Sequence, residues 1–351
     1  MAAKVAAKGV AFRATPRPAA SRLAQRLQLV CSAAREHAAA AADRRAVLLG
    51  LGAAVAAPLL QVAPAAAKEQ LIPVASLTII QRKQILAELE KRADDELSKV
   101  LTAADAPAAM RLLLADAGSY DAATKTGGCD GSIVLPEELN RPENKALAPL
   151  VEKLRQAKAA IDASANEGQG PLSWADTIVL AAKVASEAAW RQDKIDKAAD
   201  AVKGAFIADS FGNPIDVKLG RIDAASANPS GRVPATDASL EEVQAFFTQL
   251  GAKPGAGEGA FSRKAPFTER QQFLLWPAVQ TDGVATEAAM AAFNPKYAEW
   301  KQQYDSSRQT VTRTSYEVDL AATFAKLANL GAKYDKDAYL FPIKAKLPDR
   351  Y

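Results

Sequence analysis

The chain is poor in the residues that carry most nucleophilic, metal and disulfide chemistry. Its 351 residues include one histidine, His37, and two cysteines, Cys31 and Cys129. Beyond His37 a Ser-His pair and a histidine-containing metal cluster are excluded. Aromatic residues make up only 6% of the sequence. Together with abundant alanine, this favours helices over a sheet sandwich.

Positive charge is concentrated at the N-terminus. The first 67 residues contain nine Lys or Arg but only Glu36 and Asp43 as acids. The remaining chain has 35 basic and 38 acidic residues, a net charge of about −3. No basic stripe of the kind that binds nucleic acid is left, so no nucleic-acid partner is expected.

The N-terminal segment has the composition of two targeting signals in tandem. Residues 1–42 are basic, acid-poor and alanine-rich, which predicts a chloroplast transit peptide. Residues 43–67 begin with the twin arginine Arg44-Arg45, continue as an apolar run and end in small residues, with Ala65 and Ala67 forming an A-x-A cleavage site. We therefore expect import into the thylakoid lumen, cleavage after Ala67 and a mature domain of residues 68–351.

A membrane anchor is the alternative for this segment, because the weakly polar stretch 46–67 exceeds 20 residues. Pro58, Gln61 and Pro64 interrupt it, and it has no long Leu/Ile core. We expect cleavage, and hence a protein that is peripheral to the membrane. Cleavage would remove His37 and Cys31, leaving a mature chain with no histidine and no internal disulfide.

Apolar residues recur three and four apart in most of the mature chain, which predicts an all-α domain from about residue 70 to 335. We expect no strands and a loose C-terminal tail. Residues 212–239 are rich in Gly, Pro, Asn and Ser and predict a long loop, and 252–259 a second one. The expected helices are 77–101, 105–117, 145–163, 173–190, 240–250, 268–275, 286–293 and 316–330.

Five segments resemble the class I plant haem peroxidase family, and ascorbate peroxidase most closely. "AGSYDAATKTGGCDGSI" is similar to the family's "AGTYDAKTKTGGPNGSI". The others follow in family order: "LPEELNRPENKAL", "GPLSWADTIVLAAKVA", "LGRIDAASANPSGRVP" and "SYEVDLAATFAKLANLG". The resemblance implies a haem-peroxidase-like helical fold, although residues 252–311 do not align.

The resemblance also assigns the catalytic positions, and most of them have lost their chemistry. Arg111 falls on the distal arginine, Leu114 on the distal tryptophan and Ala115 on the distal histidine. That histidine supplies acid–base catalysis worth about 10²–10⁴-fold. The proximal histidine that ligates the iron belongs in residues 251–267, which contain none. We therefore expect no haem and no catalytic residue.

Other residues could in principle replace these ligands. Sulfur candidates are Cys129, Met110 and Met290, and seven tyrosines are present, but we expect core packing for Cys129 and Met110. Asp121, Asp130 and Ser132 resemble the calcium loop of secreted peroxidases, with an incomplete oxygen cage. No metal site is predicted.

Two residues that support the distal histidine in the family, Asn144 and Glu138, are retained here although that histidine is absent. In the family, the counterpart of Asn144 orients the distal histidine, with Glu138 nearby. Here we expect the two to form a structural hydrogen-bonded pair. Arg111 should pair with a carboxylate or reach solvent, since a buried cation requires a partner. Trp276 is either a partner-binding anchor or, as we favour, a core residue.

Three functions follow from these observations. The first is a non-catalytic, peroxidase-like protein of the thylakoid lumen, for which the resemblance to lumenal members of the family implies association with photosystem II or other thylakoid membrane proteins. The second is a haem peroxidase that removes hydrogen peroxide through atypical ligation. The third is a carrier whose vacated haem cavity holds a pigment, lipid or quinone. The sequence favours the first, and composition does not separate it from the third.

Overall fold

The computed structural model describes residues 69–121, 123–211, 215–230, 232–250, 267–309 and 315–346. The predicted leader, with Arg44, Arg45, Ala65 and Ala67, lies outside these residues. Residues 251–266, where the proximal histidine of the family would fall, lie outside them as well.

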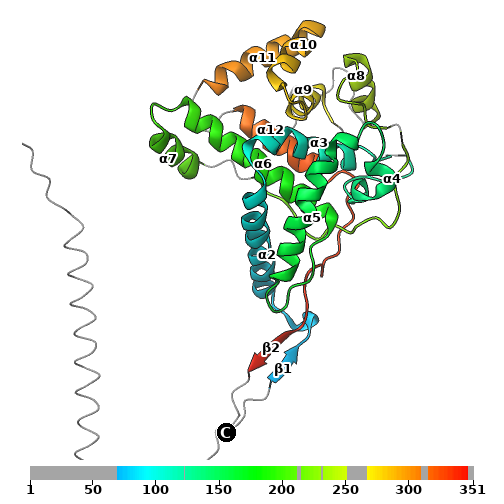
Figure 1. Cartoon of the computed structure of the whole chain (residues 1–351), viewed down its shortest axis with the longest axis vertical. Coiled ribbons are helices and arrows are strands. Elements are labelled where there is room, and N and C mark those ends of the chain that lie inside the picture. Colours follow the sequence, from blue (N-terminus) through cyan, green and yellow to red (C-terminus); the bar gives the residue numbers. More distant parts are fainter. Residues whose placement is uncertain are drawn as a thin grey trace, which may run out of the picture. The chain divides into compact units, whose positions relative to one another are not determined.

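Eleven α-helices and two strands make up the regular structure of the described residues (Figure 1). The strands are β1 (Glu69–Ile72) and β2 (Ile343–Lys346), and 3-10 helices occupy Val74–Ser76, Ala103–Asp105, Ser132–Val134 and Lys145–Leu147. The helices are α2 (Ile79–Val100), α3 (Ala106–Ala117), α4 (Pro136–Leu139), α5 (Ala148–Ala163), α6 (Trp174–Lys197), α7 (Ala201–Phe211), α8 (Leu240–Gln249), α9 (Glu269–Ala278), α10 (Gly283–Phe293), α11 (Pro295–Arg308) and α12 (Ser315–Ala328).

Side-chain caps fix where several helices begin. Thr78 and Gln81 form a capping box at the start of α2, and Ser239 and Glu242 form one at α8. Ser173 accepts a hydrogen bond from the Asp176 amide (3.1 Å) at the start of α6. Each cap satisfies amides that have no partner within the helix. The predicted helices begin within a few residues of these positions.

Three helices of the described chain, the single turn α4 together with α7 and α11, were not predicted, and α6 is longer than expected. The apolar pattern of α6 stops at Trp190, but Asp193 and Lys197 pair at 2.8 Å and sustain its last turn. The buried face of α7 consists of the small residues Gly204 and Ala208. It therefore lacks the large apolar residues whose spacing predicts a helix. Helix α11 is mostly polar, with Tyr297 and Tyr304 buried and Trp300 partly buried against the core.

The expectations of a loose C-terminal tail and of no strands were wrong. β2 pairs with β1 in antiparallel register, with Ile343 opposite Ile72, and the ribbon extends beyond one end of α2 (Figure 1). Tyr339, just before β2, is 8% exposed. Local periodicity does not reveal such a pairing, because the partner strand lies more than 250 residues away.

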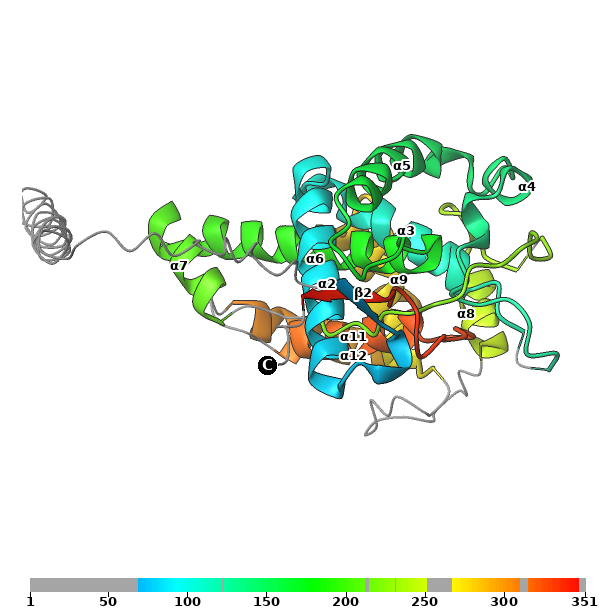
Figure 2. The same ribbon diagram turned by 90° about the horizontal axis from the view of Figure 1, so that it is seen from below.

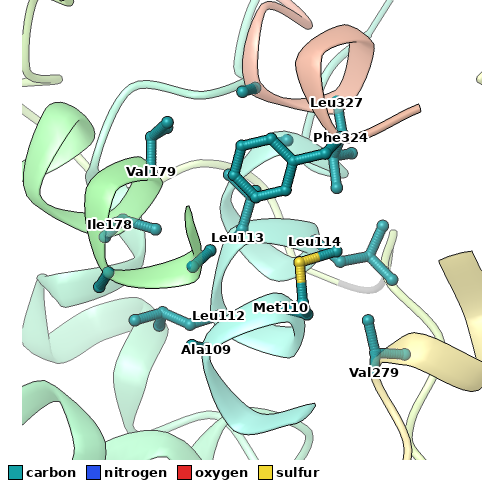
Figure 3. Packing of buried hydrophobic residues seen from close by; sticks show 14 of the residues in the cluster. Ala109, Met110, Leu112, Leu113, Leu114, Ile178, Val179, Val279, Phe324 and Leu327 are labelled. Atoms are coloured by element: carbon teal, nitrogen blue, oxygen red, sulfur yellow. The ribbon is translucent and has the colours of Figure 1, made fainter. Parts of the chain in front are cut away.

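Helix α3 lies in the core, in contact with α6, α9 and α12 (Figures 1 and 2). Ala109, Leu112, Leu113 and Leu114 on this helix are fully buried. Figure 3 shows them among Ile178 and Val179 of α6, Phe324 and Leu327 of α12, and Val279 at the end of α9. None of the helices in the described residues is long and apolar enough to span a membrane.

A buried ion pair connects four segments around the start of α6. Arg221 Nη1 donates to Asp176 Oδ1 at 2.6 Å, and both side chains are fully buried. Arg221 Nε donates to the Ala328 carbonyl at the end of α12 (2.9 Å). Asp176 Oδ2 accepts from the Gly220 amide (2.5 Å) and from the Tyr339 hydroxyl (2.6 Å). The Gly-Arg-x-Asp segment therefore joins α6, α12 and the C-terminal segment.

Substituting Asp176→Asn tests this connection. It keeps the shape of the side chain but leaves the Arg221 guanidinium without its counter-charge, so we expect the free energy of unfolding to fall by about 3–5 kcal/mol. Urea unfolding at 25 °C measures the change. Asp209→Asn, at a carboxylate that is 64% exposed, is the matched control and should stay within about 0.5 kcal/mol. Equal losses in the two variants would contradict the assigned role.

Candidate functional site

The structure places the three family positions of the distal site on the buried side of α3. Leu114 is 0% exposed, and Arg111 and Ala115 are each 3% exposed. In Figure 3 the Leu114 side chain points toward Val279, with Met110 beside it. The position of the distal tryptophan is thus occupied by a core leucine, which offers a neighbouring group only apolar contact.

Arg111 is a buried cation with one hydrogen-bonded nitrogen. Its Nη2 donates to the Pro234 carbonyl (2.6 Å), whereas Nε and Nη1 have no partner in the described part of the chain. Burial lowers the pKa of Arg111 to about 10, and the more distant Glu143 opposes this only in part. The expectation of a carboxylate pair or solvent access was wrong, because the loop that contains Pro234 closes over the guanidinium.

Next to Ala115 is a recess of about 10 Å³, bounded by Ser119, Asn144, Arg232 and Val233 among others. This is the volume of about one water molecule. A porphyrin could not enter it without displacement of the surrounding loop. The recess therefore does not provide the open pocket that the distal face of a haem requires.

Asn144 and Glu138 contact each other through the backbone. Asn144 Nδ2 donates to the Glu138 carbonyl at 3.0 Å, while its Oδ1 has no partner among the described residues. The Glu138 carboxylate accepts from the Asn228 amide and lies 3.7 Å from Arg141. The pair thus connects the segment before α5 to the loop around Asn228. Neither side chain has a histidine to orient.

A polar network that the sequence did not single out holds the loop after α3. Asn228 Nδ2 lies within hydrogen-bond distance of Ser132 Oγ (2.7 Å), Ser119 Oγ (3.1 Å) and the Asp130 carboxylate (3.3 Å). Asp116 accepts from the Gly131 amide at 2.9 Å, and burial raises its pKa. Only the position of Asn228 between the two Gly-Arg segments could have pointed to this role.

The loop compared with a calcium site is organised around amide donors. The Asn228 amide faces Asp130 and Ser132, where a cation would need acceptors, and Asp121 pairs with Arg232 at 2.9 Å. Among the described residues no group of three or more His, Cys, Asp and Glu side chains could hold a metal ion.

The remaining candidate ligands are in the core. Cys129 and Met290 are fully buried and Met110 is 3% exposed. Burial raises the pKa of the Cys129 thiol, which disfavours the thiolate that binds metals. Trp276 is 2% exposed, so it is a core residue rather than an exposed anchor. On the described side of the site, the residues present do not fit a haem.

Comparisons with known proteins agree with this fold. Residues 90–254 match the peroxidase family model. The thylakoid lumenal 29 kDa chloroplastic protein of Solanum lycopersicum is 36% identical over 315 residues, covering 85% of this chain and 83% of that protein. Its Arabidopsis thaliana namesake is 35% identical over 245 residues, covering 68% and 65%.

The crystal structure of the TL29 protein from Arabidopsis thaliana is 33% identical, with a TM-score of 0.65, and covers 74% of this chain and 99% of that one. This similarity confirms the all-α, peroxidase-like fold, and the relatives confirm the predicted localisation in the thylakoid lumen. The chain belongs to the peroxidase family and is a peroxidase-like protein of the chloroplast thylakoid lumen.

Proposed function

We propose that this protein is a non-catalytic member of the peroxidase family that works by binding thylakoid membrane proteins, those of photosystem II foremost. The observation that carries the proposal is the burial of Leu114 and Ala115 in the core, at the positions where the family places its distal tryptophan and histidine. An alanine methyl group cannot take a proton from peroxide. Acid–base catalysis by that histidine is worth about 10²–10⁴-fold in rate, and no group in the recess beside Ala115 replaces it.

Arg111 supports the same proposal. A distal arginine stabilises developing charge only if its donors face the reacting oxygen. Here one donor is used by the Pro234 carbonyl, and the side chain is 3% exposed. The guanidinium is therefore enclosed by protein where a catalytic arginine would face a ligand.

The other two functions have less support. A peroxidase with atypical ligation would need Cys129 or a methionine to leave the core. A carrier that held its ligand beside Ala115 would need more room there than about 10 Å³. Neither requirement agrees with the packing of α3.

A binding role has a candidate surface on α7. Val202 is 81% exposed and Phe206 is 70% exposed, one helical turn apart, while Gly204 and Ala208 face α6. In Figures 1 and 2 this helix and the end of α6 extend beyond the neighbouring helices. Exposed apolar side chains held on a projecting helix are typical of a protein contact.

The first prediction concerns haem. When the unit Ala67–Tyr351 is produced with haem supplied, we expect no Soret band at one haem per chain and no peroxide-dependent oxidation of ascorbate above a protein-free control. An active ascorbate peroxidase prepared in parallel shows that haem loading works. A stoichiometric Soret band together with turnover would support the peroxidase alternative and contradict the proposal.

The second prediction compares two buried arginines. Arg111→Met removes a cation that has no ion pair, so we expect the free energy of unfolding to stay the same or rise by about 1–2 kcal/mol. Arg221→Met removes the ion-pair partner of Asp176 and should lower the free energy of unfolding by about 3–5 kcal/mol. Urea unfolding of both variants is the measurement. A large loss in Arg111→Met would mean that this arginine still has a structural partner.

The third prediction concerns membranes. We expect the unit to co-sediment with thylakoid membranes enriched in photosystem II, and the double variant Val202→Glu/Phe206→Glu to reduce the bound fraction at least about tenfold. Val284→Glu, at an exposed apolar residue on α10 (76% exposed), is the matched control. Equal binding by all three proteins would exclude α7 as the contact, and no binding by any would contradict the membrane role.

A further inference from the structure

A second cavity lies among α3, α6 and the C-terminal helices, away from the distal positions. Its volume is about 610 Å³, within the range of sites that hold small organic ligands. Arg111, Leu114 and Ala115 do not line it. Met110, on the neighbouring face of α3, does.

The wall of this cavity is mostly apolar, with charged groups that largely neutralise one another. Ala106, Pro107, Ile215 and Phe324 are among its apolar members. Most charged side chains on the wall are in ion pairs. These pairs are Asp193–Lys197 at 2.8 Å, Arg308–Glu287 at 2.5 Å, Lys301–Asp305 at 2.5 Å, and Glu317 with Lys194 at 2.8 Å.

Glu187 differs from these groups. Its Oε1 accepts from the Ile215 amide at 3.1 Å, and no basic side chain of the described residues lies within ion-pair distance. Lys183, one helical turn before Glu187 on α6, is already held by Glu90 and Asp94 at 2.7 and 2.8 Å. Burial raises the pKa of Glu187, with Lys183 opposing the shift. A carboxylate in this setting is stabilised by any donor, and most by a cation.

Trp190 lies one turn beyond Glu187 on α6 and lines the same cavity. An indole ring attracts cations that approach its face, and Lys194 Nζ already lies 5.5 Å from the centroid of the Trp190 ring, so a ligand cation has to use the part of the ring that Lys194 leaves open. Four of the five acidic residues on the wall are in ion pairs, one of them with Lys194, so the single excess negative charge is that of Glu187, which favours a positive ligand.

We propose that this cavity binds an organic amine with an aromatic or branched apolar body, whose ammonium group pairs with Glu187 beside the Trp190 ring. The apolar body fills the space between α3 and α12. The site does not depend on the non-catalytic role proposed above, because it lies apart from the distal positions and uses none of their residues.

Isothermal titration calorimetry of the unit Ala67–Tyr351, which contains all of the described core, tests the proposal with two probes of the same shape. Tryptamine carries the ammonium group, and tryptophol has a hydroxyl in its place. We expect one site per chain, with tryptamine binding at least about tenfold more tightly than tryptophol.

Three variants assign the interaction. Glu187→Gln keeps an acceptor for the Ile215 amide but removes the charge, and it should bring tryptamine to the affinity of tryptophol. Ala321→Trp narrows the cavity and should weaken both probes. Glu152→Gln, at a carboxylate on α5 that is 60% exposed, should bind like the unaltered protein. Urea unfolding confirms that each variant is folded.

Three outcomes would overturn the proposal. One is the lack of saturable tryptamine binding up to millimolar concentration. Another is equal affinity for the two probes, which would make the cavity a general apolar site. The last is unchanged tryptamine binding by folded Glu187→Gln, which would place the amine elsewhere.

Discussion

The described fold depends on satisfying one fully buried carboxylate. Asp176 lies in the first turn of α6 and accepts from Arg221, from the Gly220 amide and from Tyr339. A buried charge with an incomplete shell costs several kcal/mol, so these segments must come together as a unit. Asp223 adds to the same junction, because its carboxylate accepts from the Trp174 and Ala175 amides at 2.8 and 2.9 Å. None of these bonds involves a haem ligand, so the scaffold is held together independently of the family's cofactor.

This independence explains how α3 can keep its place without its catalytic residues. Burying a leucine side chain stabilises a fold by about 1.5–3 kcal/mol relative to an exposed one. Leu114 gains that contact with Val279 and Met110, at the position where the family has an indole. The conversion is incomplete at Arg111, because two of its nitrogens have no partner in the part of the chain that the structure describes. The distal side has thus become a core that still contains one ion without a counter-charge.

The sequence predicted those parts of the fold that local patterns encode. The spacing of apolar residues predicted helices such as α2 and α12, and the Gly-Arg-x-Asp segment was recognised through its family resemblance. Helix α7 was missed because its buried face consists of Gly204 and Ala208, and the β1–β2 ribbon because its strands are far apart in the chain. The partners of Arg111 were predicted wrongly for the same kind of reason. Whether a loop closes over a guanidinium depends on tertiary packing, which cannot be predicted from the spacing of residues in the sequence.

Arg111 and Glu187 are both charged groups without an ion pair, yet they have opposite meanings. Arg111 is 3% exposed and enclosed by α3 and the Pro234 loop, and the recess beside the neighbouring Ala115 has room for about one water. No ligand can complete its shell without displacing protein, so the charge is best explained as a remnant. Glu187 lines a cavity of about 610 Å³ next to an indole ring, where a ligand can supply the missing charge without rearrangement. An unpaired charge therefore indicates a binding site only where space for its partner adjoins it, and in this chain that space lies beside α6 rather than at the distal positions of the family.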